Sequence, residues 1–378
     1  MILGIDASNI RGGGGVTHLI ELLGLAEPGR SGFEKVVIWG GDKTLERISD
    51  KPWLKKVNHP ALNQGLLRRT IWQRFYLSRH SEKEKCDVLF VPGGSYSGRF
   101  KPVVLMSQNL LPFELRESGR YKWSFLWIKF LLLRKVQSRS FKNANGVIFL
   151  TEYARDAVEK VTGKLQGKTC VIPHGISTRF MKSPKEQRSI NDYSESDPLR
   201  ILYVSIVDQY KHQWNVVEAV HALRRLGFAV SLELVGPAYP PALDRLKRVM
   251  NSFDPDESWA HYIGSVSYDV LHRIYARADI GVFASTCENL PIILLETMGA
   301  GLPIACSGYG PMPEVLGDAG IYFDPEKPYE LTSALGTLVA SPELRAEKAA
   351  AGYQRCLRYN WPQSAEKTFD FLSAIADS

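Results

Sequence analysis

The chain alternates between short, almost uninterrupted apolar runs and longer segments in which apolar residues recur with a helical spacing. Runs of this kind are typical of parallel strands buried on both faces of a sheet, and each is closed here by Gly, Pro or a polar loop. The predicted strands begin at or near Ile2, Val36, Val88, Val103 and Gly146 in the first half, and Ile201, Ser231, Tyr262, Ile280 and Ile304 in the second. The pattern predicts an α/β fold with two doubly wound, Rossmann-like domains.

The segment 278–325 shows the clearest order of elements. Residues 280–283 predict a buried strand. Pro291, which is tolerated in the first turn of a helix, marks the start of a helix that runs to Gly299. Glu288 and Glu296, two carboxylates eight positions apart, are therefore expected in different kinds of structure. Glu288 is in the loop at the carboxyl end of a strand, where open parallel sheets bind ligands, and Glu296 is within the helix.

A glycine-rich stretch follows the first strand. Gly12–Gly15 form a run of four glycines before a helical pattern that begins at Val16. Backbone amides at a helix start can approach a phosphate where no Cβ intervenes, so this stretch is a candidate phosphate-binding loop. A plain flexible turn is the alternative. The spacing matches neither a P-loop nor the dinucleotide fingerprint.

The pair Glu288 and Glu296, followed by residues 297–303 and by residues 313–315, resembles the donor-site signature of the retaining glycosyltransferases of family 4. The resemblance covers nearly the whole chain and is strongest over residues 201–325. It implies the GT-B fold, in which two Rossmann-like domains face each other across a cleft. It also implies transfer of a sugar, with retention, from a nucleotide-diphosphate sugar, without a metal or a cofactor.

The resemblance further implies roles for single residues. Glu288 would face the donor sugar, Glu296 would hold the ribose hydroxyls, and Lys211 would act as a catalytic cation on the diphosphate. The remaining donor-binding positions would be Gly14, Gly15, Gly236, Val266, Asn289 and Leu290. On the acceptor side, Asn109 takes the place where many members have a histidine, and Ile206 takes the place of a diphosphate-binding arginine.

A polar segment suggests where the domains meet. Residues 183–198 lack apolar periodicity and follow a complete set of strand and helix units, so they predict a linker. We expect residues 1–182 to form the acceptor-side domain and residues 199–360 to bind the nucleotide sugar. Because Asn360-Trp361-Pro362 resembles the start of the family's last helix, residues 361–378 are expected to pack back on the first domain.

Composition narrows the class of protein and of partner. The 378 residues are 44% hydrophobic and 23% charged, as in soluble globular proteins. Five cysteines without paired spacing argue against a disulfide scaffold or a zinc site. Residues 1–180 contain 29 Lys and Arg and 15 Asp and Glu, a balance of +14, and the remainder contains 18 and 25, a balance of −7. The basic first half predicts an anionic partner there.

The candidate anionic partners are a membrane surface and a phosphorylated or lipid-linked acceptor. Nucleic acid is not expected, because no helix-turn-helix pattern or aromatic-interleaved basic motif occurs. Residues 121–142 are amphiphilic, but Lys129, Arg134 and Lys135 interrupt them well short of a bilayer span. We favour a core helix here over an interfacial helix. The arginines of residues 68–79 are expected on a solvated helix face.

We therefore expect a cytoplasmic enzyme that is peripheral on the membrane face, since residues 1–10 predict a first strand and not a signal peptide. The expected reaction transfers a hexose-like sugar to a saccharide or lipid-linked acceptor in surface polysaccharide synthesis, such as that of O-antigen, lipopolysaccharide or capsule. Two alternatives remain open. One is a nucleotide-sugar 2-epimerase of the same fold, which needs no acceptor. The other is a sugar-nucleotide-binding protein without turnover, which Ile206 and Asn109 would allow.

Overall fold

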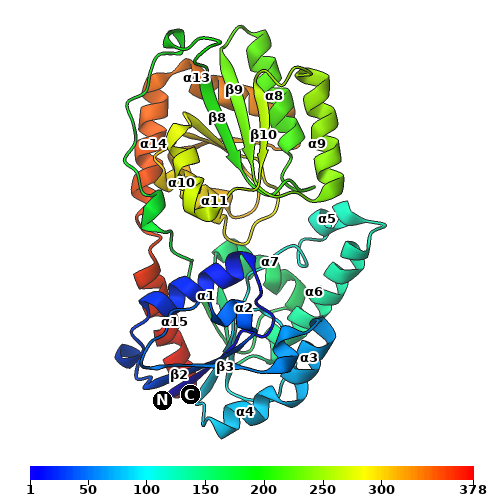
Figure 1. Cartoon of the computed structure of the whole chain (residues 1–378), viewed down its shortest axis with the longest axis vertical. Helices are drawn as coiled ribbons and strands as arrows, with labels where there is room; N and C mark the ends of the chain where they lie inside the picture. The colour runs from blue at the N-terminus through cyan, green and yellow to red at the C-terminus, as the bar shows by residue number, and fades with distance from the viewer. The chain divides into compact units, whose positions relative to one another are not determined.

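The computed structural model describes residues 1–378 and divides them into two compact units. Unit 1 contains residues 1–175 and 359–378, and unit 2 contains residues 176–358. Each unit is built on one parallel sheet with helices packed around it (Figure 1).

Unit 1 has a seven-stranded sheet in the order β3-β2-β1-β4-β5-β6-β7. Its strands are β1 (Ile2–Asp6), β2 (Lys35–Gly40), β3 (Leu54–Asn58), β4 (Val88–Val91), β5 (Val103–Met106), β6 (Gly146–Phe149) and β7 (Lys168–Val171). Its helices are α1 (Gly13–Leu25), α2 (Asp42–Leu45), α3 (Leu66–Phe75), α4 (Leu77–Lys83), α5 (Leu115–Ser118), α6 (Phe125–Asn143), α7 (Glu152–Thr162) and α15 (Trp361–Ala376). The central strands are fully buried, which explains their unbroken apolar runs.

Unit 2 has a six-stranded sheet in the order β10-β9-β8-β11-β12-β13. Its strands are β8 (Leu199–Val204), β9 (Val230–Val235), β10 (Ala260–Gly264), β11 (Ile280–Phe283), β12 (Ile304–Ser307) and β13 (Gly320–Phe323). Its helices are α8 (Gln213–Arg225), α9 (Pro240–Phe253), α10 (Tyr268–Arg277), α11 (Ile292–Gly299), α12 (Met312–Leu316), α13 (Pro328–Ala340) and α14 (Pro342–Cys356). Both sheets are parallel in every pair of neighbouring strands.

The chain changes from unit 1 to unit 2 between Gly175 and Ile176, before the linker predicted at residues 183–198. That polar segment belongs to unit 2. Lys185 Nζ lies 2.6 Å from Asp279 Oδ1, and Arg345 donates to the side chain of Gln187 at 3.1 Å. These contacts are made by polar side chains, which is why the segment lacks the apolar periodicity of a packed element.

The last helix, α15, returns to unit 1. It packs against α1 and β4, beside α1 in Figure 1, and its first turn is capped by Asn360, whose side chain accepts from Gln363 N at 2.9 Å. A histidine pair is buried next to its start. The rings of His18 and His174 are 4.4 Å apart, and His174 stacks on Trp361 at 5.3 Å.

The amphiphilic helix α6 differs from the expected core helix. Its buried residues are confined to its last two turns, while Phe125 is 80% and Leu132 is 60% exposed. The cause is its position on the outside of unit 1, where only the end of the helix meets the sheet (Figure 1). No helix in the chain combines the length and the apolar composition that crossing a bilayer requires.

Candidate active site

The sheet of unit 2 reverses its winding between β8 and β11. From β8 the chain adds β9 and then β10 on one side, and it continues with β11, β12 and β13 on the other. Loops that leave adjacent strands in opposite directions open a space at the carboxyl edge of the sheet, where ligands bind in folds of this kind. Lys211 lies in the loop after β8, and Glu288 lies in the loop after β11.

These two loops bring Lys211 and Glu288 into contact. Lys211 Nζ donates to Glu288 Oε1 in an ion pair whose side chains are 5% and 16% exposed. The ammonium group also lies 5.1 Å from the ring centroid of Tyr210 and 5.3 Å from that of Phe283. An enclosed cation between aromatic faces has a fixed position and little water around it, so it attracts an anionic group strongly.

Backbone and hydroxyl contacts hold the two loops together. Thr286 N donates to Tyr210 O at 2.9 Å, and the hydroxyl of Tyr203 donates to Lys211 O at 3.0 Å. Burial, together with the nearby Glu288 carboxylate, raises the pKa of the Tyr203 and Tyr210 hydroxyls well above their ordinary value. Both tyrosines therefore remain neutral and do not compete with Glu288 as an anionic partner of Lys211.

Glu296 lies in α11 and is only 2% exposed. The hydroxyl of Tyr275 donates to its Oε2 at 3.1 Å. Burial raises the pKa of Glu296 to about 7, against hydrogen bonds from Tyr275 and Tyr268 that lower it. The carboxyl group thus changes charge near neutral pH. Neither tyrosine was predicted from the sequence, although their spacing of seven residues places them on one face of α10.

Gly236 follows β9 and passes close to the loop after β8. Its φ is +145°, and a Cβ there would lie 2.1 Å from the carbonyl oxygen of Ser205. The hydroxyl of Tyr262 donates to Gly236 O at 2.8 Å. Only glycine fits this position, because both the backbone conformation and the contact exclude a side chain.

The other donor-side positions also belong to unit 2. Val266 is half-buried in the segment between β10 and α10. Asn289 and Leu290 are buried just before α11. Their backbone thus lies at the start of a helix, as the sequence predicted for Asn289 and Leu290.

Gly14 and Gly15 lie in the first turn of α1 in unit 1. A Cβ on Gly14 would meet nothing within 4 Å, and one on Gly15 would lie 3.5 Å from Gln108 Oε1. The start of α1 therefore lies next to the loop after β5, which also holds Asn109. The side chain of Asn109 accepts from Leu111 N at 3.2 Å and is exposed.

Buried polar groups support this edge of unit 1. Gln73 donates to the buried Asp6 carboxylate at 2.5 Å, and Arg69 donates to Ser8 O at 3.0 Å. Burial raises the pKa of Asp6, against hydrogen bonds from Ser8 and Gln73 that lower it. Arg69 is thus buried against the end of β1, in contrast to its predicted place on a solvated face, because only a long side chain with several donors reaches these acceptors from α3.

Two family models match the chain one after the other. The model described as Glycosyltransferase Family 4 matches residues 12–180, and the model described as Glycosyl transferases group 1 matches residues 185–355.

Two curated relatives are mannosyltransferases by name. The O-antigen chain mannosyltransferase B of Escherichia coli is 29% identical over 224 residues, which are 59% of this chain and 56% of that protein. The GDP-mannose-dependent alpha-(1-6)-phosphatidylinositol monomannoside mannosyltransferase of Mycolicibacterium smegmatis is 26% identical over 265 residues, 66% of this chain and 67% of that protein. The match thus spans little more than half the length of the first relative.

Solved structures match along almost the full length. Sucrose-phosphate synthase from Thermosynechococcus elongatus has a TM-score of 0.78 at 16% identity and covers 100% of both chains. Anabaena HepE in complex with UDP has a TM-score of 0.72 at 17% identity and covers 99% of both. WaaG, a glycosyltransferase involved in lipopolysaccharide biosynthesis, has a TM-score of 0.69 at 16% identity and covers 98% of this chain and 99% of its own. At these identities the likeness is one of fold.

Proposed function

The chain belongs to family 4 of the glycosyltransferases and has their GT-B fold, and on this premise we propose that it transfers a sugar from a nucleotide-diphosphate sugar to a saccharide or lipid-linked acceptor. The family and the GT-B fold are those that the sequence predicted, so both predictions are confirmed. The proposed pathway is the synthesis of a surface polysaccharide, in line with the names of the O-antigen and lipopolysaccharide proteins to which the chain is similar.

The ion pair of Lys211 and Glu288 supports this proposal most directly. A donor diphosphate carries more negative charge than a carboxylate, so it would displace Glu288 as the partner of Lys211. Lys211 would then stabilise the charge that develops when the bond between the anomeric carbon and the diphosphate breaks. The released Glu288 would face the donor sugar and stabilise positive charge on it. The acceptor oxygen would bond to the anomeric carbon on the face that the diphosphate leaves, with retention, and the acceptor's proton would pass to the departing diphosphate oxygen.

The buried Lys211 also suggests whether the reaction requires a metal ion. A fixed cation next to the departing diphosphate can take the role that a divalent metal has in other transferases, so we propose that transfer needs no metal. Activity that persists after treatment with EDTA would support this, and activity that returns only with added Mg²⁺ or Mn²⁺ would contradict it.

Glu296 would bind the ribose of the donor. An ionised carboxylate accepts hydrogen bonds from two neighbouring hydroxyls, whereas its protonated form has lost part of this capacity. Gly236 and the amides at Asn289 and Leu290 would line the rest of the donor site. Gly14 and Gly15, at the exposed start of α1, would contribute amides to the diphosphate, and Asn109 would orient the acceptor.

The basic unit 1 favours an acceptor that carries phosphate or is linked to lipid. Exposed apolar side chains of α6 stand next to Lys129, Arg134 and Lys135 on the same helix, the combination by which interfacial helices bind anionic membranes. We therefore propose that the protein works on the cytoplasmic face of a membrane, to which it binds reversibly.

Two measurements test the proposed reaction. Thermal stabilisation by a panel of nucleotide sugars identifies the donor, beginning with GDP-mannose and UDP-glucose because the names of similar proteins include them. Transfer is then measured for Glu288→Ala, with Glu218→Ala as the control, since Glu218 is exposed on α8. We expect Glu288→Ala to lose transfer by at least about a hundredfold and to keep nucleotide binding. Wild-type turnover in Glu288→Ala would refute the assignment. Conversion of the donor without acceptor would point to an epimerase.

A further inference from the structure

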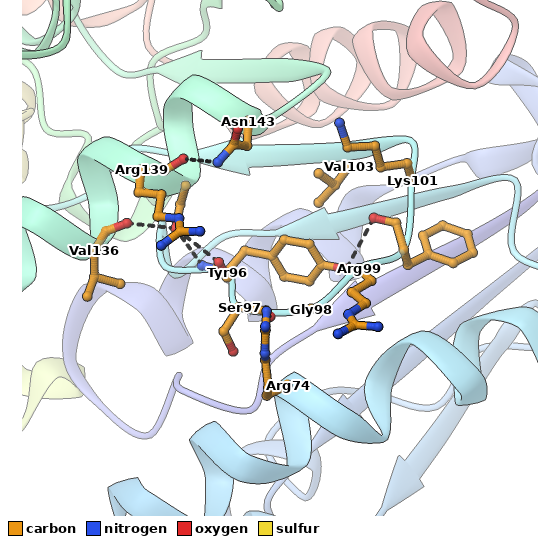
Figure 2. A pocket seen from close by; sticks show the side chains of 12 residues that line it. Arg74, Tyr96, Ser97, Gly98, Arg99, Lys101, Val103, Val136, Arg139 and Asn143 are labelled. Atoms are coloured by element: carbon orange, nitrogen blue, oxygen red, sulfur yellow. Dashed lines mark hydrogen bonds between the residues drawn. The ribbon is translucent and has the colours of Figure 1, made fainter.

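A pocket of about 450 Å³ lies in unit 1, outside the proposed donor and acceptor positions. Its walls are the segment between β4 and β5, the end of α3 and the last two turns of α6 (Figure 2). Val103 is the first residue of β5, and Asn143 is the last residue of α6 before β6. The pocket therefore reaches the amino edge of the sheet, whereas Gly14 and Asn109 lie at the carboxyl edge.

The lining of this pocket is strongly basic. Four of its residues are cationic, and none is acidic: Arg74, Arg99, Lys101 and Arg139. Some surface lysines of unit 1 are paired with a carboxylate, as where Lys35 and Lys55 share Glu84. None of the four cations of the pocket takes part in an ion pair. Four like charges around one cavity repel each other, so this arrangement costs stability unless an anion fills it.

Hydrogen bonds within the wall give the pocket a defined shape. Tyr96 N donates to Ser140 Oγ at 3.0 Å, and the amides of Arg99 and Phe100 donate to Ser78 Oγ at 2.9 and 3.0 Å. A Cβ on Gly98 would lie 2.6 Å from the hydroxyl of Tyr96, so a larger residue would displace this ring where the segment folds over it.

The guanidinium groups are arranged around this frame. Arg74 donates one N–H to Ser97 O at 2.8 Å, which sets its position and leaves other donors for a ligand. The side chains of Arg99 and Arg139 make no hydrogen bond within the protein. Figure 2 shows these three arginines around the segment from Tyr96 to Gly98.

We infer that this pocket binds the phosphate group of an organic phosphate. Guanidinium groups bind phosphate through paired, charge-assisted hydrogen bonds, and three of them with one lysine match the charge of a phosphate monoester or a diphosphate. The volume suits a small ligand or a headgroup. Val136, which lines the pocket and belongs to the exposed apolar face of α6, would contact the organic part. The inference does not depend on the proposed sugar transfer.

The test compares two double variants of the full chain. Arg99→Gln/Arg139→Gln removes two pocket charges without breaking a hydrogen bond. Arg68→Gln/Arg79→Gln removes two exposed charges of α3 and α4 outside the pocket. Calorimetry measures the binding of inorganic pyrophosphate to both variants and to the protein with the wild-type pocket, all in a Lys211→Ala background that weakens phosphate binding at the donor site. We expect affinity to fall at least about tenfold in the pocket variant and to stay within about twofold in the control.

A second arm identifies the source of the phosphate. Binding to phosphatidylcholine vesicles that contain phosphatidic acid is measured for both variants, with and without pyrophosphate. Loss of binding in the pocket variant, with competition by pyrophosphate in the wild type, supports a lipid headgroup. Unchanged vesicle binding together with lost pyrophosphate binding supports a soluble phosphate. Equal pyrophosphate affinity of the two variants, or no binding by the wild type, would overturn the inference. Because sugar transfer is not measured, these outcomes are independent of the proposed function.

Discussion

Acid should destabilise unit 1 through its buried histidine pair. Burial lowers the pKa of His18 to about 3, and burial together with the neighbouring His18 lowers the pKa of His174 well below its usual value. Both nitrogens of His18 lack a hydrogen-bond partner, so no group in the folded protein would stabilise the protonated, charged ring. The unfolded chain, in which the pKa of histidine is about 6.5, binds that proton readily.

The size of the effect follows from this difference. The pKa of His18 is lower in the folded protein than in the unfolded chain. The contribution of the neutral ring to the stability of unit 1 is therefore complete above pH 6.5 and is lost as the pH falls from 6.5 toward 3. At pH 5 the loss for His18 is about 1.5 pH units multiplied by 1.36 kcal/mol, or about 2 kcal/mol. His174 adds a loss of the same sign. For a unit of this size, about 2 kcal/mol lowers the melting temperature by about 4–8 °C.

The assay is urea unfolding at pH 7 and pH 5, followed by the fluorescence of tryptophan, since Trp361 stacks on His174. His18→Leu removes the titrating group and two unpartnered polar atoms at similar volume. We expect the fall in unfolding free energy between the two pH values to be about 2 kcal/mol smaller in this variant than in the wild type. His261→Leu, in unit 2, serves as the control. An equal fall in His18→Leu and the wild type would refute the reasoning.

Three other predictions concern the donor site and the membrane. Because Glu296 has a raised pKa of about 7 and binds ribose best when ionised, the KM for the donor should rise about tenfold for each pH unit below 7. Tyr275→Phe removes a bond that lowers this pKa and should shift the rise to higher pH; a pH profile of KM identical to that of the wild type would contradict this. Gly236→Ala should destabilise unit 2 by at least about 3 kcal/mol in urea unfolding, since its Cβ would collide with a backbone carbonyl, and a loss below about 1 kcal/mol would exclude that clash. The protein should sediment with anionic vesicles at low salt and be released at high salt, and Leu132→Ser in α6 should weaken this binding; failure to bind at any salt concentration would remove the membrane proposal.

The segment around Glu288 and the helix α6 show what could and could not be predicted from the sequence. The order strand, loop, helix, strand around Glu288 could be predicted because apolar runs, Pro291 and Gly301 act over a few positions. The exposure of most of α6 could not be predicted. Its apolar residues are as hydrophobic as those of a core helix, and only the position of the helix on the outside of unit 1 leaves them exposed.

The sequence by itself determined most strands of the two parallel sheets, and the loop and helix that carry Glu288 and Glu296, because these follow from local periodicity and local backbone restriction. The strands β3 and β7 were not predicted, because their residues do not form an unbroken apolar run. The tertiary structure alone decided which side chains meet. Lys211 and Glu288 are 77 residues apart and come together only because β8 and β11 are neighbours where the sheet reverses. The bond from Tyr275 to Glu296 likewise depends on how α10 packs, and so does the pKa of that carboxyl group, since burial and partners arise from contacts between distant segments.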